Sequence, residues 1–245
     1  MQQEVKQFDS ISKKYSSFVD GDPVRNFLHY PGVIRALGDI QSKDILDIGC
    51  GDGLFDRKLA KENGATVTGY DKAPDLIAIA QKEEENVTLG ISYSIDDPLS
   101  FRSQKLFDEA VSIMVLPYSP DASYLSNFLA SAYEHLKVGG SFISVVINPN
   151  FTAFGLQVAN RVFNKLEEGK VEVNFLNPKT KELMFKAVLS QYSEEVYQGA
   201  AKNSGFSESL WEPLNPTKEG LELLGREFWN SCEELQPYAL FIARK

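Results

Sequence analysis

Up to about residue 147, short apolar runs alternate along the chain with longer stretches that have helical spacing. The clearest unit begins with the apolar run 45–48, which is typical of a parallel strand buried on both faces. Three closely spaced glycines follow, and apolar residues with helical spacing then predict a helix over 54–63 that ends at Gly64. The pattern therefore predicts a strand, a glycine loop and a helix.

The same alternation continues beyond this unit. It predicts further strands over 65–71, 87–95, 107–116 and 141–147, and helices over 74–85 and 121–136, the second of them ended by Gly139 and Gly140. Strands that alternate with helices in this way indicate an α/β fold with a doubly wound, parallel sheet. With right-handed crossovers, the carboxyl ends of the strands would share one edge, where open sheets bind ligands.

Two segments depart from the alternation. Residues 1–39 carry aromatic and apolar positions broken by turn signals, and we expect short helices there that pack on the sheet or form a lid over a cofactor. Residues 148–192 contain two strand-like stretches, 170–176 and 182–189, which predict an inserted hairpin or cap. Loops on a rigid sheet carry specificity, so four aromatic residues of the insertion are candidates for a substrate wall, with core packing as the alternative: Phe151, Phe154, Phe163 and Phe175.

The end of the chain returns to regular elements. We expect helices over 193–203 and 218–227, and strands over 206–212 and 238–243 that form a hairpin completing the sheet. Phe228-Trp229 is predicted to lie in the connection before the last strand. Because the sequence contains no internal repeat or long linker, we interpret residues 1–245 as a single domain with an embedded cap.

Composition narrows the classes of function. With 43% hydrophobic residues, a chain of 245 residues has enough apolar surface for a sizeable core. The net charge of −9 argues against nucleic-acid or anionic-membrane binding, since both require clustered Lys and Arg. Cys50 and Cys232 are too few for a disulfide framework or a metal cluster, so we expect no metal. Without an apolar span or signal region, we expect a cytoplasmic protein whose partner is a small molecule.

The candidate chemistry lies in the glycine loop and in the acids that follow it. Gly49, Gly51 and Gly53 lack a Cβ at alternate positions, which lets the backbone approach a ligand closely. Asp71 ends the next strand about twenty residues later, the spacing of the acid that binds ribose in nucleotide-binding βαβ units. At 96–98, the sequence Asp-Asp-Pro either forms a turn or places a carboxylate beside an adenine amino group.

With these residues in place, the chain resembles the class I S-adenosylmethionine-dependent methyltransferases. Their acid-x-Gly-x-Gly-x-Gly loop matches Asp47 and the three glycines, while Asp71 matches the ribose-binding acid and Asp97 the acid beside the adenine. The segment 136–140 resembles the family's Leu-Lys-Pro-Gly-Gly turn, with Val138 in place of proline. The resemblance implies a Rossmann-like, seven-stranded, mostly parallel sheet with an antiparallel last strand. It also implies S-adenosylmethionine as cofactor and S-adenosylhomocysteine as product.

The resemblance extends to the two ends of this region. Residues 7–11 with Tyr15 are similar to the family's N-terminal Tyr-Asp-x-x-Ala-x-x-Tyr element, although Phe8 replaces the first tyrosine. The segments 148–151 and 228–230 are similar to those of toxoflavin-synthase-like small-molecule methyltransferases. The cofactor site that we predict on these grounds consists of Asp47, Gly49, Cys50, Gly51, Gly53, Asp71, Lys72, Asp96, Asp97, Met114 and Tyr15.

The implied activity is methyl transfer to a small-molecule acceptor by in-line displacement. A sulfonium methyl group is already a strong electrophile, so proximity and orientation carry most of the catalysis. A general base is needed only if the accepting atom must lose a proton. His29 and Tyr118 are the candidates for such a base, and His135 is interpreted as structural.

Two other functions are compatible with a glycine loop. A nicotinamide-dependent oxidoreductase would need a third glycine at position 54, where this chain has Leu54. A catalytically silent scaffold protein that binds the cofactor would show the same motif, because the motif reports binding and not turnover. The sequence leaves open the methyl acceptor and the choice between a monomer and a homodimer.

Overall fold

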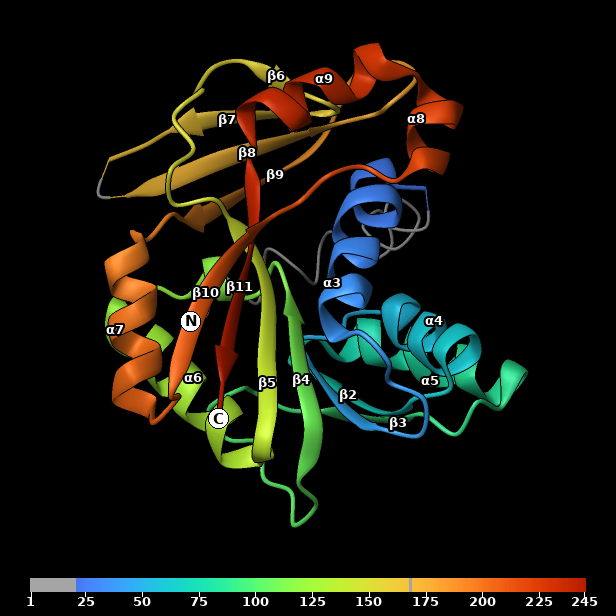
Figure 1. The fold of residues 1–245 in the computed structure, drawn as a ribbon. Coiled ribbons are helices and arrows are strands. Elements are labelled where there is room, and N and C mark those ends of the chain that lie inside the picture. Colours follow the sequence, from blue (N-terminus) through green and yellow to red (C-terminus); the bar gives the residue numbers. More distant parts are fainter. Residues whose placement is uncertain (1–20, 168) are drawn as a thin grey trace.

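A seven-stranded sheet with strand order β10-β11-β5-β4-β1-β2-β3 organises the protein, whose computed structural model describes residues 21–167 and 169–245 (Figure 1). The elements in chain order are η1 Arg25–His29, α3 Tyr30–Leu37, β1 Asp44–Ile48, α4 Leu54–Asn63, β2 Thr66–Asp71, α5 Pro74–Val87, β3 Ser92–Ile95, β4 Phe107–Ile113, η2 Leu116–Tyr118, α6 Ala122–His135, β5 Leu136–Ile147, β6 Gln157–Val158, β7 Arg161–Lys165, β8 Lys170–Leu176, β9 Leu183–Ser190, α7 Glu194–Ser204, β10 Glu208–Pro213, α8 Lys218–Leu224, α9 Arg226–Leu235 and β11 Tyr238–Arg244.

The centre of this sheet is β1, which pairs in parallel with β2 on one side and β4 on the other. Its residues Ile45, Leu46 and Ile48 are fully buried, as a strand covered on both faces requires. The last strand, β11, runs antiparallel to both β5 and β10. The predicted doubly wound, mostly parallel sheet with an antiparallel last strand is confirmed, and the strand order reverses between β1 and β4, where ligands bind in folds of this class.

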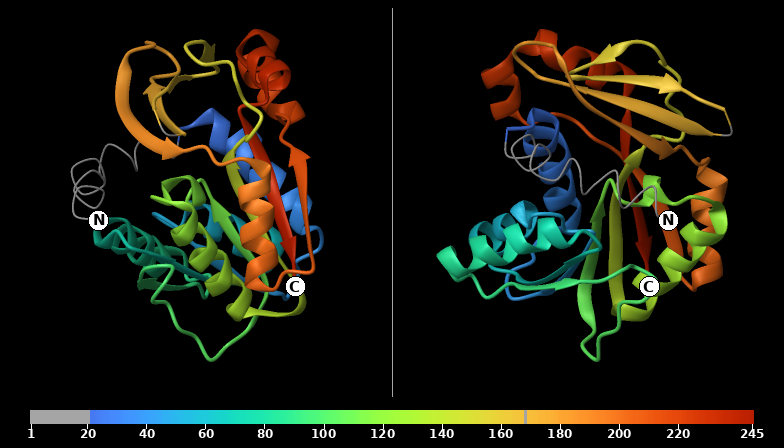
Figure 2. Two further views of the ribbon diagram at one scale, coloured as in Figure 1. Left: turned by 90° about the vertical axis from the view of Figure 1, so that its left-hand side faces the viewer. Right: turned by 180° about the vertical axis from the view of Figure 1, so that it is seen from behind.

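Helices cover both faces of the sheet, as the two rotated views show (Figure 2). On one face, Phe55 and Leu59 of α4 belong to the same apolar cluster as Ile45 of β1. On the other, Phe128 of α6 and Tyr197 of α7 share a second cluster with strand residues that point the opposite way. Alternate strand residues therefore feed two separate helix layers.

A second, antiparallel sheet with strand order β6-β7-β8-β9 forms the insertion and lies beyond the carboxyl end of β5 (Figure 1). The predicted strands 170–176 and 182–189 appear as β8 and β9. The sequence reading missed β6 and β7, so the insertion is a four-stranded sheet instead of a hairpin. Phe163 and Val173 of this sheet pack in one continuous apolar cluster with Trp229 of α9 and Tyr238 of β11.

Among the predicted element ends that differ from the structure, two concern the helices α6 and α9. Instead of a glycine cap after α6, the chain passes directly into β5 at Leu136. The Lys245 Nζ donates hydrogen bonds to the carbonyls of Tyr133 and Leu136 at 2.8 Å, and a residue distant in sequence thus satisfies the helix end. The pair 228–229 lies on a helix, α9, where the Trp229 indole donates to the Gly220 carbonyl.

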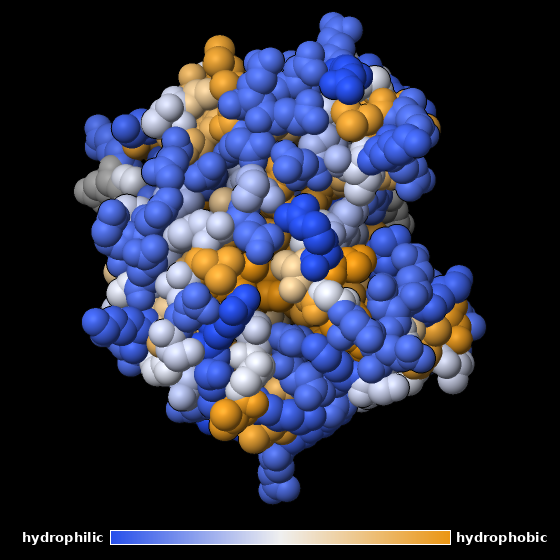
Figure 3. Space-filling view, viewed as in Figure 1, coloured by the Kyte–Doolittle hydropathy of each residue, from blue (hydrophilic) through white to orange (hydrophobic). Residues whose placement is uncertain are grey.

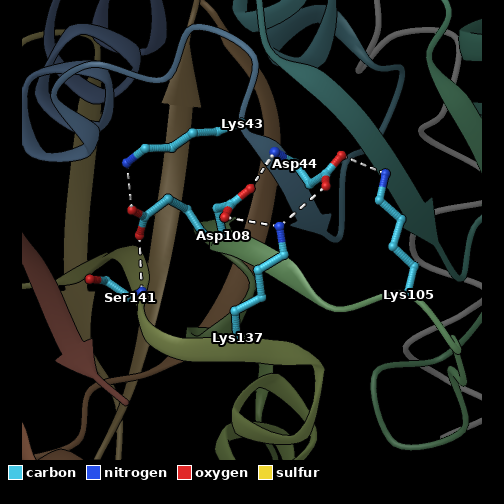
Figure 4. Close-up of polar contacts among 7 residues, drawn as sticks. Lys43, Asp44, Lys105, Asp108, Lys137 and Ser141 are labelled. Atoms are coloured by element: carbon cyan, nitrogen blue, oxygen red, sulfur yellow. Dashed lines mark hydrogen bonds and ion pairs between the residues drawn. The ribbon is translucent and has the colours of Figure 1, made fainter.

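A network of charged side chains joins the amino ends of β1, β4 and β5, at the edge opposite the carboxyl ends (Figure 4). Asp108 accepts from the Asp44 backbone N–H at 2.8 Å and from Lys137 Nζ at 2.9 Å, and Lys105 Nζ contacts Asp44 at 2.7 Å. Lys43 Nζ contacts the Glu109 carboxylate at 3.1 Å. These groups are paired with one another, so we interpret the network as structural.

The face drawn in Figure 3 is mostly hydrophilic, with apolar areas separated by polar side chains. Such a surface is ordinary for a folded protein and marks no broad apolar docking area on this side. None of the helices in the described part of the chain is long and apolar enough to span a membrane.

Candidate functional site

A cavity of about 370 Å³ opens at the carboxyl ends of β1, β2 and β4, within the volume range of small-molecule sites. Its lining combines backbone of the glycine loop, acids at strand ends and aromatic side chains. The residues that line it are Arg25, Tyr30, Asp47, Gly49, Cys50, Gly51, Phe55, Tyr70, Asp71, Lys72, Ala73, Leu76, Asp96, Asp97, Pro98, Ile113, Met114, Val115, Tyr118, Pro120, Tyr124 and Phe128.

The glycine loop forms one wall of this cavity, and two of its glycines have different roles. Gly49 has φ +80°, and a Cβ there would lie 2.4 Å from the Val115 side chain, so close packing requires glycine. Gly51 has φ +60°, and a Cβ there would have only Leu76 nearby, at 3.9 Å. Since Gly51 lines the cavity, its missing side chain leaves space that a ligand can occupy.

Asp71 connects β2 to the glycine loop. One carboxylate oxygen accepts from the Gly51 N–H at 3.0 Å and the other from the Ala73 N–H at 2.9 Å. Burial raises the pKa of Asp71, and these hydrogen bonds oppose that shift. The acid therefore holds the loop in shape while it lines the cavity.

Asp96 and Asp97 also line the cavity, and they shape a turn. Asp96 Oδ1 accepts from the Asp97 N–H and the Ser100 hydroxyl, and Asp97 Oδ1 accepts from the Leu99 N–H. The two sequence interpretations, turn and ligand contact, are thus compatible, because each interaction uses only one oxygen of each carboxylate.

The end of β4 and the turn after it add apolar and aromatic residues to the lining of the cavity. Met114 has φ +60°, an uncommon conformation for a residue with a side chain, and its N–H donates to the Val145 carbonyl at 2.9 Å. The chain then turns through η2, which brings Tyr118 to the cavity, and Tyr124 follows from the first turn of α6. Asp121 caps this helix by accepting from the Tyr124 N–H.

The described part of the N-terminal segment adds two residues to the lining that the sequence analysis did not single out. Arg25 begins the π-helical turn η1 and Tyr30 begins α3, and both line the cavity. π-Helical turns are rare and often occur at functional sites. Tyr15, predicted for the cofactor site, lies outside the described residues.

The structure does not bring His29 to the cavity. Its ring is 2% exposed and packs edge-on against Tyr238 with ring centroids 4.4 Å apart. Burial, with the nearby charges of Arg161 and Arg25, lowers its pKa well below the usual value. A neutral ring in this position is part of the core, whereas Tyr118, the other candidate base, does line the cavity.

Sequence reasoning missed several residues of the lining and proposed some that lie elsewhere. Gly53 precedes α4 outside the lining, and its carbonyl accepts from the Tyr93 hydroxyl at 3.3 Å. The four phenylalanines proposed as a substrate wall are absent from the lining; Phe151 and Phe163 are buried in the core, and Phe175 stacks on Phe185. Aromatic lining residues such as Phe55, Tyr70 and Phe128 gave no separate signal, because their spacing equals that of core residues.

These features fit a polar nucleoside that carries positive charge. Asp47 Oδ1 is buried without a hydrogen-bond partner and the residue lines the cavity, where Gly51 leaves open space. Asp71, Asp96 and Asp97 add further acceptors. Within residues 21–167 and 169–245, no group of three or more His, Cys, Asp or Glu is arranged to hold a metal ion.

Comparisons with known proteins find methyltransferases similar to part of this chain. Residues 45–140, which span the strand, glycine loop and helix and continue to β5, match the family described as "Methyltransferase domain". The ubiquinone biosynthesis O-methyltransferase of Coxiella burnetii (strain Dugway 5J108-111) is 33% identical over 143 residues, which cover 57% of this chain and 59% of that protein. The chain thus spans about three fifths of the length of this relative.

Solved structures share the fold over most of the chain. An S-adenosylmethionine-dependent methyltransferase from Mesorhizobium loti superimposes with a TM-score of 0.65 at 22% identity, covering 93% of this chain and 100% of that one. The [4+2]-cyclase SpnF superimposes with a TM-score of 0.55 at 18% identity, covering 84% and 76%. At these identities the likeness shows the fold alone, and the second protein demonstrates that this fold also serves other chemistry.

Proposed function

We propose that this chain, which belongs to the class I S-adenosylmethionine-dependent methyltransferases, transfers a methyl group from S-adenosylmethionine to a small-molecule acceptor. The observation that carries the proposal is the cavity at the carboxyl edge of the sheet, because Asp47, Gly49, Gly51, Asp71 and Asp97 converge on it from separate strands. Convergence of these residue types on one cavity matches the pattern that their order in the sequence predicts.

The chain's own residues would bind and orient the donor. Gly49 and Gly51 offer backbone without side chains, Asp71 offers its carboxylate toward ribose hydroxyls, and Asp97 offers an acceptor for an adenine amino group. The donor, when bound, supplies an electrophilic methyl group on a positively charged sulfur. No residue of the chain needs to form a covalent bond for such a transfer.

The acceptor would be oriented by aromatic side chains of the cavity. Tyr30, Tyr118 and Tyr124 line it, and they present flat apolar surface with hydroxyl groups. Orientation of two reactants in this way is worth about 7–11 kcal/mol in favourable cases. Tyr118 is the candidate to accept a proton from the acceptor if one must leave. The name of the curated relative suggests oxygen acceptors as the first compounds to try.

Calorimetry with two cofactor classes tests the donor. We expect the protein to bind S-adenosylmethionine and S-adenosylhomocysteine and not to bind NAD(H). The opposite preference would support the nicotinamide-dependent oxidoreductase that the glycine loop also permits. Binding of the S-adenosyl compounds without release of S-adenosylhomocysteine from a broad panel of acceptors would instead favour the catalytically silent scaffold.

Replacing Asp71 by alanine is expected to weaken donor binding about 10- to 100-fold. The change removes a charged acceptor, and hydrogen bonds to charged groups are worth about 1.5–3 kcal/mol. It also removes the two backbone contacts that hold the glycine loop. Calorimetry would measure the affinity. Asp75→Ala, an exposed acid in the first turn of α5, is the matched control and should leave affinity unchanged.

The cytoplasmic location, the monomer or homodimer state and the toxoflavin-synthase-like group remain predictions. The same holds for the division of the chain into one domain with a lid at 1–39 and a cap at 148–192. Within the described residues, Arg25 and Tyr30 line the cavity, whereas no residue of 148–192 does.

A further inference from the structure

The Asp56 carboxyl group lies buried beneath the glycine loop, in the first turn of α4. The residue is 0% exposed, and within the described part of the chain no backbone N–H and no cationic side chain donates a hydrogen bond to its carboxylate. A buried carboxylate without such a donor is costly, so its environment must offset the charge or supply a proton. One neighbouring group that can share a proton with it is another acid.

That acid is Asp47 of the glycine motif, as the strand register shows. Asp47 on β1 pairs with Gly69 on β2, and partners in a parallel ladder point to the same face of the sheet. A Cβ on Gly69 would lie 2.5 Å from Asp56 Oδ2. The missing side chain of Gly69 therefore admits the Asp56 carboxyl group next to Asp47, which is itself 3% exposed and has an unpartnered Oδ1.

The groups around this pair are mostly acidic or neutral. Those that face it are Asp52 and Cys50 of the loop, Arg57 of α4, Asp71 of β2 and Tyr93 of β3. Arg57 is the cation among them, and its Nη1 donates to the Asp52 carbonyl at 2.7 Å. The Tyr93 hydroxyl donates to the Gly53 carbonyl.

Both carboxyl groups titrate far from their ordinary range. Burial raises the pKa of Asp56 to about 6, and the hydrogen bond to Asp47 opposes this rise. Burial, together with the charge of Asp56 and the hydrogen bond to it, raises the pKa of Asp47 well above its usual value. Two carboxyl groups buried side by side resist ionising together, so we expect the pair to hold one proton, mainly on Asp47.

We propose that Asp56 is a positioning residue for the methyl donor: it shares one proton with Asp47 under the glycine loop, and this proton leaves when a positively charged donor enters the cavity. The inference rests on the proposed function, since it requires a cationic ligand in this cavity. The O–H bond of the shared carboxyl group breaks, its electron pair stays on the carboxylate, and the proton passes to solvent. The pair then faces the bound cation with one more negative charge than in the free protein.

The release of this proton determines whether the affinity for the donor rises or falls with pH. A cation near the pair favours the ionised carboxylates, so the pair loses its second proton at a lower pH in the complex than in the free protein. Binding thus releases a proton over the interval between these two pH values. Within that interval the affinity for the donor rises with pH, by at most about tenfold per pH unit for one linked proton.

Calorimetry of S-adenosylmethionine binding at pH 7, in two buffers with different heats of ionisation, counts the protons released. Three proteins are compared: the wild type, Asp56→Asn and Asp75→Asn. In Asp56→Asn the amide donates to Asp47 and keeps it ionised, so we expect close to one proton fewer than in the wild type and a flatter dependence of affinity on pH. Asp75→Asn, which changes an exposed acid at the equivalent place in α5, should release as many protons as the wild type. The ligand's own ionisation is the same in all three titrations.

The outcomes separate this inference from the function on which it rests. Equal proton release by all three proteins would overturn the inference and leave the donor assignment intact. No donor binding by the wild type would overturn the proposed function and this inference together. Infrared spectroscopy of the free proteins adds a measurement that needs no ligand: the carbonyl stretch of a neutral carboxylic acid should be present in the wild type and lost in Asp56→Asn. Its absence from the wild type would also overturn the shared proton.

Discussion

Replacing Arg161 by methionine is expected to lower the free energy of unfolding by about 3–5 kcal/mol, as is typical when one partner of a buried ion pair is removed. Arg161 of β7 is 2% exposed, and its guanidinium contacts the fully buried Asp22 and donates to Asn160 Oδ1 at 2.6 Å. Methionine would leave the Asp22 carboxylate buried without this cation. Urea unfolding of the two proteins measures the difference.

Two further variants test whether the loss of stability comes from breaking a buried ion pair or from removing any positive charge. Arg244→Met removes a cation whose partner is Glu208 at the surface, and a loss of no more than about 1 kcal/mol is expected there. Asp22→Asn in the Arg161→Met background should recover part of the lost stability, because no buried charge remains. A loss at Arg161 as small as at Arg244 would contradict the structural role assigned to this pair.

The pair also links the insertion to the chain segment that lines the cavity. Asp22 connects β7 of the inserted sheet to the segment that precedes η1, and Arg25 Nε lies 4.0 Å from the same Asp22 carboxylate. Arg25 lines the cavity, whereas no described residue of the insertion does. Asp22 thus connects the insertion to a residue of the lining, while the phenylalanines that the sequence suggested lie outside it.

Replacing Gly51 by valine is expected to reduce the affinity for S-adenosylmethionine by more than about 100-fold, which corresponds to about 2.7 kcal/mol. The branched side chain would enter the cavity, since a Cβ at this position has only Leu76 nearby. It would also force a β-branched residue into the left-handed region, which costs about 1–2 kcal/mol. Calorimetry measures the affinity, and thermal unfolding measures the strain separately.

Gly90→Val is the matched control for that strain. Gly90 has φ +82°, has nothing within 4 Å of an added Cβ and lies in an exposed connection away from the cavity. It should lose a similar amount of stability and keep the affinity of the wild type. If Gly51→Val bound the donor as well as Gly90→Val does, the glycine loop would not be the wall of the donor site.

The local part of the site could be predicted from the sequence because each of its signals is short. The apolar run at 45–48 is explained only by a strand buried on both faces, and Asp71 follows it at the spacing of one helix and one strand. Asp96 and Asp97 come at the end of the next strand, so their place at the carboxyl edge follows from the strand order. Errors appeared where a distant residue replaced a local signal, as when Lys245 satisfied the end of α6 in place of Gly139.

The sequence by itself determined the strand-helix alternation, the glycine loop and the acids at the strand ends, because periodicity and turn chemistry act over a few neighbouring residues. Only the tertiary structure decided which aromatic residues face the cavity, since core and lining residues share one spacing. The tertiary structure also decided that His29 is buried and that Asp22 contacts Arg161, which is 139 positions away in the sequence. It likewise placed Asp56 beside Asp47, where Gly69 leaves space for the carboxyl group. Each of these depends on which surfaces pack together, and a contact between distant segments leaves no periodic trace in either of them.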